Sequence, residues 1–399
     1  MADPSFMEVS ISARAAKRLR EGHVWVYASD VTGDNGAQSG ALAQVLDANK
    51  QLLGTALYSS SSQIKLRLLT RRPLSSENEF LQLVRDRLAS AVEYRKMVVT
   101  GSDSCRLVFS EADLLPGLIV DRYNDICTLQ VLTQAWDQPG RKQAIAGELQ
   151  ELTQAEHIAE RAEDRIRELE QLPPLPPGLL HGSKSATVFS MNGVRFHYDA
   201  RSGQKTGAFL DQRENYAAAA AYAHGTALDV CTYQGGFALH LARVCERVTA
   251  LDISREALEA AEQNEKLNAA ANKNEIEWME ANAFDLLKDY ATAGRQYDVI
   301  VLDPPAFARS KRNLPAAIRG YKELNLRALK MLRPGGILVT CSCSFHVSEP
   351  SFLELLTAAA QDAHRSVRVL EKRTQSRDHP ILLGVPESCY LKCVICSVC

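Results

Sequence analysis

The 399-residue sequence contains no apolar run of the roughly 18 residues that a membrane-spanning helix requires. Its first residues also lack the basic and then apolar pattern of a secretory signal. The net charge of −2 excludes a uniformly basic nucleic-acid-binding protein, so any contact with nucleic acid would need local basic clusters. The ten cysteines follow no framework spacing, which favours a reducing compartment, and we expect the protein in the cytoplasm.

The sequence also has few cysteines or histidines at the spacings that are typical of metal sites. Cys393, Cys396 and Cys399 are spaced three residues apart near the end of the sequence. On a strand, residues three apart point to opposite faces, and no second pair of cysteines or histidines accompanies them. We therefore expect no metal site.

What the sequence does contain is enough apolar residues, 46%, for two or three domains. Closely spaced short strands in the first seventy or so residues favour a small barrel. A mixture of strands and helices follows, up to a stiff proline-rich linker at residues 172–178, and predicts an α+β module. The basic helix expected at residues 13–21 could contact phosphates or could be a solvated surface; the sequence leaves both alternatives open.

Residues 227–237 carry the first sign of a binding site. An apolar run ending in Asp229 and Val230 predicts a buried parallel strand, and Gly235 and Gly236 allow a tight turn into a helix. Asp252 ends the next strand 17 residues after Gly235, about the spacing of a ribose-binding acid. Such a unit fits a dinucleotide or S-adenosylmethionine (SAM).

Beyond residue 252, helices alternate with strands, which predicts a mostly parallel, doubly wound sheet. Its strands end in polar residues, which suits a ligand crevice, although capping of the following helix could explain any single one. Asp303 is different, because two prolines follow it and fix a rigid loop that could hold a flat ring. Cys343 ends the next strand and is a candidate nucleophile, whereas Cys341 is typical of a buried strand.

A hairpin with an Asn-Gly turn is predicted at residues 187–198, and the polar segment 204–213 after it is typical of a ligand loop. A solvated connector remains the alternative for this loop.

These segments resemble the motif series of class I SAM-dependent methyltransferases, and within them the RlmI family of large-subunit ribosomal RNA cytosine-5 methyltransferases. The first likeness rests on Asp229–Phe237, Asp252, Asn282–Phe284, Asp303–Phe307 and Ser342–Ser344. The second rests on Gly22–Val26, Leu115–Tyr123, Lys205–Arg213, Asp378–Pro380 and Tyr390–Lys392.

The resemblance implies an α/β fold with three domains. A small β-barrel PUA domain that binds RNA would span residues 1–73, and a central α+β (EEHEE) domain residues 74–184. A Rossmann-like methyltransferase sheet, mostly parallel with its last strand antiparallel, would span residues 185–399. Ribosomal RNA of the large subunit, or an assembly intermediate, would be the partner. Dimerisation is an expectation of the family alone.

For the chemistry, the resemblance implies that Cys343 adds to C6 of a cytosine while Asp303 stabilises a proton at N3. It implies that SAM is the cofactor and S-adenosylhomocysteine (SAH) the product. The implied cofactor-binding residues are Asp229, Thr232, Tyr233, Gly235, Gly236, Phe237, Asp252, Ile253, Asn282, Ala283 and Asp303, with Lys205, Thr206, Phe209, Asp211 and Arg213 from the loop.

Two positions depart from the family pattern. Ala306 stands where many cytosine-5 RNA methyltransferases carry a second cysteine, so the base that removes the C5 proton is not identified. Asn282 stands where the family tends to have Asp, so adenine recognition would rest on the backbone.

Three other functions compete with this one. The first is guanine or adenine methylation in ribosomal RNA, because the Asp303 loop with Phe307 also resembles enzymes that need no thiol. The second is a non-catalytic RNA-binding module that keeps SAM as a structural ligand. An NAD-dependent oxidoreductase is disfavoured, because no catalytic Tyr/Lys or His pair accompanies the fold.

Overall fold

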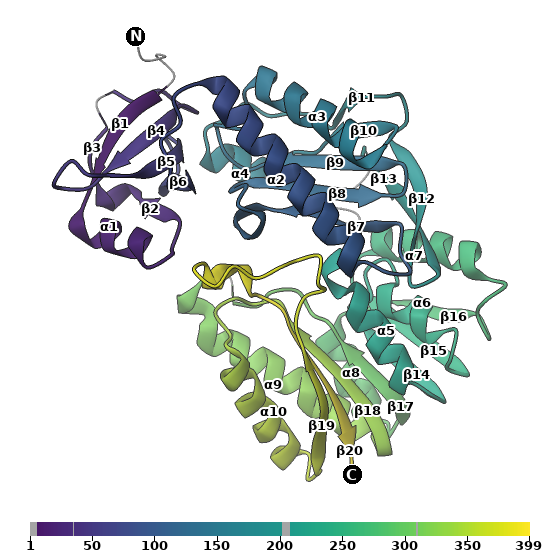
Figure 1. Cartoon of the computed structure of the whole chain (residues 1–399). Helices are drawn as coiled ribbons and strands as arrows, with labels where there is room; N and C mark the ends of the chain where they lie inside the picture. Colours follow the sequence, from purple (N-terminus) through teal and green to yellow (C-terminus); the bar gives the residue numbers. More distant parts are fainter. Residues whose placement is uncertain (1–5, 35, 202–207, 309) are drawn as a thin grey trace. The chain divides into compact units, whose positions relative to one another are not determined.

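The computed structural model describes residues 6–34, 36–201, 208–308 and 310–399, and its chain divides into two compact units (Figure 1). The first unit comprises the described residues within 1–190, 198–207 and 377–388. The second comprises residues 191–197, 208–376 and 389–399.

The first sheet of unit 1 has six strands in the order β2-β6-β5-β4-β1-β3. A cluster of buried apolar side chains from this sheet and helix α1 forms its core. The elements are β1 (Phe6–Ile11), α1 (Ala13–Arg20), β2 (Trp25–Tyr27), β3 (Val31–Gly33), β4 (Leu42–Leu46), β5 (Leu52–Tyr58) and β6 (Ile64–Thr70).

The second sheet of unit 1 has five strands in the order β11-β10-β9-β8-β7, and its core includes Phe80 and Trp136 from the adjoining helices. The elements are α2 (Glu77–Val98), β7 (Ser104–Phe109), β8 (Leu118–Tyr123), β9 (Ile126–Val131), α3 (Pro139–Thr153), β10 (His157–Glu160), α4 (Asp164–Leu169) and β11 (Gly178–His181). The short elements β3, α4 and β11 have no clear apolar period in the sequence.

A predicted hairpin, β12 (Ala186–Met191) and β13 (Val194–Asp199), follows around Asn192, whose φ of 52° suits its turn. After it comes the seven-stranded sheet of unit 2, in the order β16-β15-β14-β17-β18-β20-β19. Its elements are α5 (Arg213–Tyr222), β14 (Thr226–Val230), α6 (Gly236–Leu241), β15 (Arg247–Asp252), α7 (Arg255–Asn268), β16 (Ile276–Glu280), α8 (Ala283–Thr292), β17 (Tyr297–Leu302), α9 (Leu314–Met331), β18 (Leu332–Ser342), α10 (Glu349–Asp362), β19 (Val367–Arg373) and β20 (Lys392–Val398).

The predicted α/β fold is confirmed. Strands β14 to β18 pair in parallel, and the last strand, β20, runs antiparallel to both β18 and β19. Helices α8, α9 and α10 share one apolar cluster with the sheet, through side chains such as Leu287, Tyr321 and Phe352. Strand β14 is buried from Ala227 to Val230, as a strand covered on both faces must be.

Helix α5 begins at Arg213, because the short 3₁₀ turn at Leu210–Gln212 leads directly into it. Strand β20 begins at Lys392, where its pairing with Ser342 of β18 begins.

Candidate functional site

The carboxyl ends of β15, β14, β17 and β18 lie side by side at one edge of the unit 2 sheet. The chain reverses its direction of winding between β14 and β17, because β15 and β16 lie on one side and β17 and β18 on the other. This reversal is where open α/β sheets bind ligands. The topology therefore brings Asp252, Asp229, Asp303 and Cys343 to one edge, although they are far apart in the sequence.

Asp229 is fully buried at the end of β14. Its Oδ2 accepts hydrogen bonds from the Thr232 hydroxyl (2.6 Å) and the Ala238 backbone N–H (2.9 Å). Burial raises the pKa of Asp229 to about 7, against these two hydrogen bonds, and the nearby Asp252 charge raises it further. Among the described residues, no hydrogen-bond donor reaches Oδ1. One carboxylate oxygen thus holds the loop while the other lacks a partner.

The two glycines of the turn are required by packing. Gly235 has a φ of +84°, and a Cβ there would lie 2.9 Å from the Trp278 ring. At Gly236, a Cβ would lie 2.5 Å from the Tyr216 ring. Phe237 is buried and packs edge-on against Tyr216 with ring centroids 4.7 Å apart. The turn therefore places α6 directly against α5, which no side chain at either glycine would permit.

Asp252 lies at the end of β15, and both of its carboxylate oxygens accept hydrogen bonds from the backbone. Its Oδ2 accepts from the Tyr233 backbone N–H (2.9 Å) and its Oδ1 from that of Ser254 (3.0 Å). Each oxygen keeps a second lone pair for a ligand hydroxyl. Ile253 beside it is 69% exposed, which leaves an apolar side chain available to cover a flat ring.

Asn282 is the N-cap of α8, as the capping alternative anticipated. Its Oδ1 accepts from the backbone N–H of Phe284 (2.9 Å) and of Asp285 (3.4 Å). Ala283 packs against the core of the sheet, while Phe284 is 39% exposed. The Asn282 side-chain oxygen therefore has a structural role whether or not it also contacts a ligand.

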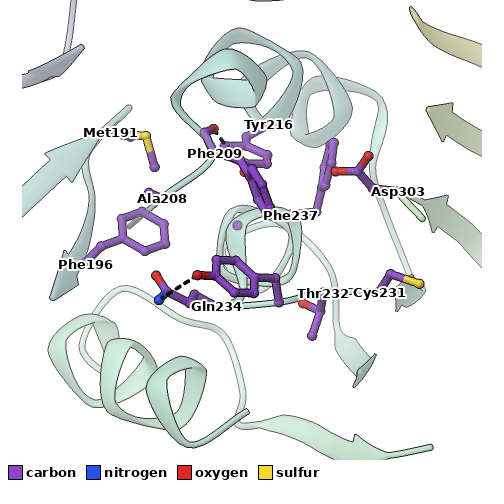
Figure 2. A pocket seen from close by; sticks show the side chains of 12 residues that line it. Met191, Phe196, Ala208, Phe209, Tyr216, Cys231, Thr232, Gln234, Phe237 and Asp303 are labelled. Atoms are coloured by element: carbon purple, nitrogen blue, oxygen red, sulfur yellow. Dashed lines mark hydrogen bonds between the residues drawn. The ribbon is translucent and has the colours of Figure 1, made fainter. Parts of the chain in front are cut away.

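A small cavity of about 20 Å³ opens beside the turn (Figure 2). Its lining comprises Met191, Phe196, Ala208, Phe209, Tyr216, Cys231, Thr232, Tyr233, Gln234, Gly236, Phe237 and Asp303. Met191 and Phe196 approach it from one side and Asp303 from the opposite side. The Phe209 and Tyr233 rings lie 4.9 Å apart, and the space between them and their neighbours holds about one water molecule.

Six of these lining residues were not among the predicted site residues: Met191, Phe196, Ala208, Tyr216, Cys231 and Gln234. Met191 and Phe196 come from the β12–β13 hairpin, whose alternation of apolar residues indicated only a strand. The buried Oε1 of Gln234 has no hydrogen-bond partner within the described ranges. Gln234 lies inside the glycine motif and would have been found by asking which polar side chain of that turn faces the ligand.

The segment after the hairpin contributes a second set of contacts. Lys205 and Thr206 lie outside the described residues. Asp211 accepts a hydrogen bond from the Tyr390 hydroxyl (2.6 Å), although these residues are 179 positions apart. The Gln212 amide donates to Asp303 Oδ2 (3.0 Å), and Arg213 begins α5 with its side chain buried. This segment therefore connects the Asp303 loop to the residues just before the last strand.

Asp303 and Cys343 have unusual acidities. Burial, and next the Asp211 charge, raise the pKa of Asp303 to about 7, against the Gln212 hydrogen bond. Burial, and next the charges of Asp303 and Asp211, raise the pKa of the Cys343 thiol to about 12. Cys343 is half-buried, whereas Cys341 is fully buried and faces Cys393 across the sheet. The thiol at the strand end is thus the accessible one of the two.

The basic helix α1 of unit 1 carries four cations, and each has a carboxylate partner. Arg14 and Arg18 bind Asp30 (2.8 and 2.6 Å), and Arg20 binds Asp47 (2.5 Å). Lys17 lies 3.7 Å from Glu21. Three carboxylates therefore partner the four cations, which favours the solvated surface over a free phosphate-binding face.

Comparison with known proteins decides the family. Residues 115–386 match the family of S-adenosylmethionine-dependent methyltransferases, and residues 9–71 match a PUA-like domain. The ribosomal RNA large subunit methyltransferase I of Klebsiella pneumoniae strain 342 is 35% identical over all of both chains. The chain belongs to the RlmI family of SAM-dependent methyltransferases. The proteins of that name from Serratia proteamaculans (35% identical, 96% of this chain and 97% of that protein) and Alteromonas mediterranea (33%, 98% of each) agree.

Solved structures show the same fold. The methyltransferase SMU.776 in complex with SAH superposes with a TM-score of 0.81, at 17% identity, over 98% of this chain and all of that one. A SAM-dependent methyltransferase from Streptococcus mutans gives a TM-score of 0.80 at the same identity and coverage. In the described part of the RlmI-family chain, no helix has the length and apolar character needed to cross a membrane.

SAM is the cofactor of this family member, and the site fits it. SAM has a cationic amino-acid end, and the unpartnered acceptors Asp229 Oδ1 and Gln234 Oε1 lie at the turn where such a group would be held. The ribose of SAM offers hydroxyl donors for the free lone pairs of Asp252. The exposed Ile253 and Phe284 offer apolar surface for its adenine.

Proposed function

We propose that this protein methylates C5 of a cytosine in large-subunit ribosomal RNA through a covalent adduct between Cys343 and C6 of the base. The observation that carries the proposal is the placement of a half-buried thiol and a carboxyl of raised pKa at the ends of adjacent strands, β18 and β17. The names of the relatives support ribosomal RNA as the substrate.

A thiol is needed because C5 of cytosine is too weak a nucleophile to accept a methyl group unaided. Addition of the Cys343 sulfur to C6 forms a C–S bond and moves electron density to C5. Bound SAM supplies the methyl group to C5. Loss of the C5 proton and breakage of the C–S bond then regenerate the free thiolate and release the methylated base.

Asp303 suits the role of stabilising a proton at N3 of the cytosine. A pKa of about 7 lets its carboxyl carry a proton at neutral pH and share it with N3 of the ring. A proton at N3 makes C6 more electrophilic. Pro304 and Pro305 fix the loop, and the Gln212 amide orients one carboxylate oxygen, so the carboxyl is held for a flat ring.

The cofactor would be held around the glycine turn. We assign its amino-acid end to Asp229 and the Thr232–Gly236 turn with Phe237, its ribose to Asp252, and its adenine to Ile253, Asn282 and Ala283. The loop residues Lys205, Thr206, Phe209, Asp211 and Arg213 would close over cofactor or base. Of these, Phe209 already meets Tyr233 across the cavity.

The substrate base must leave its stack or already be unpaired, because C6 is otherwise out of reach of a side chain. We propose that the PUA-like domain (residues 1–73) and the central domain (74–184) grip the RNA. The domain at 185–399 would carry out the transfer in the cytoplasm.

The test is transfer of tritium from methyl-labelled SAM to ribosomal RNA that lacks the modification. Cys343→Ala should reduce transfer to background, because alanine at the position of the proposed nucleophile cannot form the adduct. Cys341→Ala is the matched control, two residues earlier on the same strand and fully buried, and it should keep most of the activity. Full transfer by Cys343→Ala would refute the cytosine-5 mechanism and favour a guanine or adenine target, whereas no transfer by the wild type would favour a non-catalytic RNA-binding role.

A further inference from the structure

Lys392 is a buried cation near the proposed nucleophile. It begins β20 and pairs with Ser342, so it lies at the carboxyl edge of the sheet together with Cys343. Only 9% of the residue is exposed. Its Nζ donates hydrogen bonds to the backbone carbonyls of Ser344 and Tyr390, both at 2.7 Å.

The ammonium group has no acidic partner among the described residues. In the same unit, by contrast, Arg333 contacts the Asp298 carboxylate at 2.6 Å. Two carbonyls satisfy two of the three N–H donors of Lys392 and leave the third. A buried cation without a counter-ion is costly, and a hydrophobic residue would fill the position more cheaply.

The neighbour that responds to this charge is Cys343. Burial lowers the pKa of Lys392 to about 8, and interaction with Cys343, and then Cys389, raises it against that trend. In return, the Lys392 charge lowers the pKa of Cys343, against burial and the charges of Asp303 and Asp211. Tyr321, whose hydroxyl shares a hydrogen bond with the Ser344 hydroxyl (3.0 Å), is a further titratable group near the thiol. Within the described residues, Lys392 is thus the cation whose charge lowers the pKa of the Cys343 thiol.

We propose that Lys392 is the counter-ion of the Cys343 thiolate, a positioning residue that stabilises the ionised sulfur before and after its bond to the base. The proposal rests on the proposed function, since it gives the nucleophile its charge partner. When Cys343 loses its proton to solvent, the new negative charge meets the buried ammonium, and the pair replaces an isolated buried cation by a neutral ion pair. The two backbone carbonyls hold the ammonium in place through each turnover.

The effect of Lys392 on the reactivity of Cys343 should depend on pH in a distinctive way. Lys392 is charged below a pH of about 8 and neutral well above it. It can therefore favour the thiolate only below that pH, and its effect should fade as the pH rises further. A residue that merely filled space would alter Cys343 reactivity equally at every pH.

The test is alkylation of Cys343 by iodoacetamide in the full-length protein, followed by mass spectrometry of its peptide between pH 6 and 10. We expect Lys392→Met to slow alkylation at pH 7 about tenfold, which corresponds to one pKa unit, and to converge with the wild type near pH 10. Lys392→Arg should recover part of the rate. Exposed Cys399 gives the reference rate, and buried Cys341 must stay unreactive if the fold is kept. Equal rates in wild type and Lys392→Met at pH 7 would overturn the proposal.

A reciprocal measurement covers the case in which Lys392→Met does not fold. In Cys343→Ala, Lys392 loses the partner that raises its pKa, so its acylation by acetic anhydride at pH 8 should be faster than in the wild type. An unchanged rate would overturn the proposal. Neither readout involves RNA or methyl transfer. Failure of this ion pair is therefore distinguishable from failure of the cytosine-5 mechanism, which the Cys343→Ala transfer assay reports.

Discussion

Replacing Asp229 by Asn should stabilise the methyltransferase unit relative to the wild type, and the difference should grow as the pH rises. Asp229 is fully buried, one of its oxygens lacks a partner among the described residues, and its pKa is raised to about 7. The pKa of this carboxyl is higher in the folded state than its unfolded value of 3.8. The folded protein therefore loses stability as the pH rises from 3.8 through 7, because folding then buries a charge. Asn has nearly the same shape and cannot ionise, so it avoids this loss.

The size of the effect follows from the two pKa values. The raised pKa of Asp229 lowers the free energy of unfolding by about 2 kcal/mol at pH 5 and by about 4 kcal/mol at pH 8. The hydrogen bonds from Thr232 and Ala238 can pass to the Asn oxygen and add an offset that does not change with pH. The stability of Asp229→Asn relative to the wild type should therefore increase by about 2 to 3 kcal/mol between pH 5 and pH 8.

Hydrogen exchange of the β14 and β15 peptides, corrected for intrinsic rates, measures this locally, because the chain contains two units and need not unfold in one step. Asp298→Asn is the matched control. Burial raises the pKa of Asp298, but the hydrogen bonds from Arg333 and Thr226 outweigh it and lower the pKa below 3.8. Asp298 is therefore ionised throughout this range, and its variant should lose a constant amount of stability. A difference between Asp229→Asn and wild type that does not change with pH would refute the reasoning.

Three further results are expected. The affinity of the wild type for SAM, measured by calorimetry, should rise between pH 6 and 8 as Asp229 ionises and becomes a better partner for the cofactor's cationic end; the same rise in Asp229→Asn would contradict this. Gly235→Ala should destabilise the protein by about 1 to 3 kcal/mol and weaken SAM binding, because Gly235 has a φ of +84° and a Cβ there would meet the Trp278 ring. An unchanged melting temperature and an unchanged SAM affinity would contradict this. Tyr390→Phe should cost about 1 kcal/mol by removing the hydrogen bond to Asp211, and should lower kcat more than SAM affinity; a change in affinity alone would contradict the assignment of Asp211 to the closing loop.

The sequence was most informative where function and local pattern coincide. A buried strand that ends in an acid is visible as an apolar run with one polar residue at its end, and this pattern identified Asp229, Asp252 and Asp303. Topology then places such ends at one edge without further information. For this reason the fold and the candidate residues of the sheet edge could be predicted together.

The sequence alone did not show which of these side chains are needed for the fold and which are free to contact a ligand. Asn282 is a helix cap, and Asp252 holds two backbone N–H groups. The two glycines are needed for the packing of Trp278 and Tyr216 as much as for a ligand. These roles depend on contacts between elements, which no local pattern records.

Contacts over long sequence separations were equally hidden. The Asp211–Tyr390 hydrogen bond joins residues 179 positions apart, and Lys392 meets Ser344 across 48 positions. Lys392 belonged to a segment that carried the family likeness, yet its relation to Cys343 follows only from the antiparallel pairing of β20 with β18.

The most direct test of the central claim is mass-spectrometric mapping of ribosomal RNA from a strain that lacks this protein. We expect one cytosine of the large-subunit RNA to lose a methyl group at C5, and the wild-type chain to restore it, whereas Cys343→Ala does not. Loss of a methyl group from a guanine or adenine, or restoration by Cys343→Ala, would contradict the account.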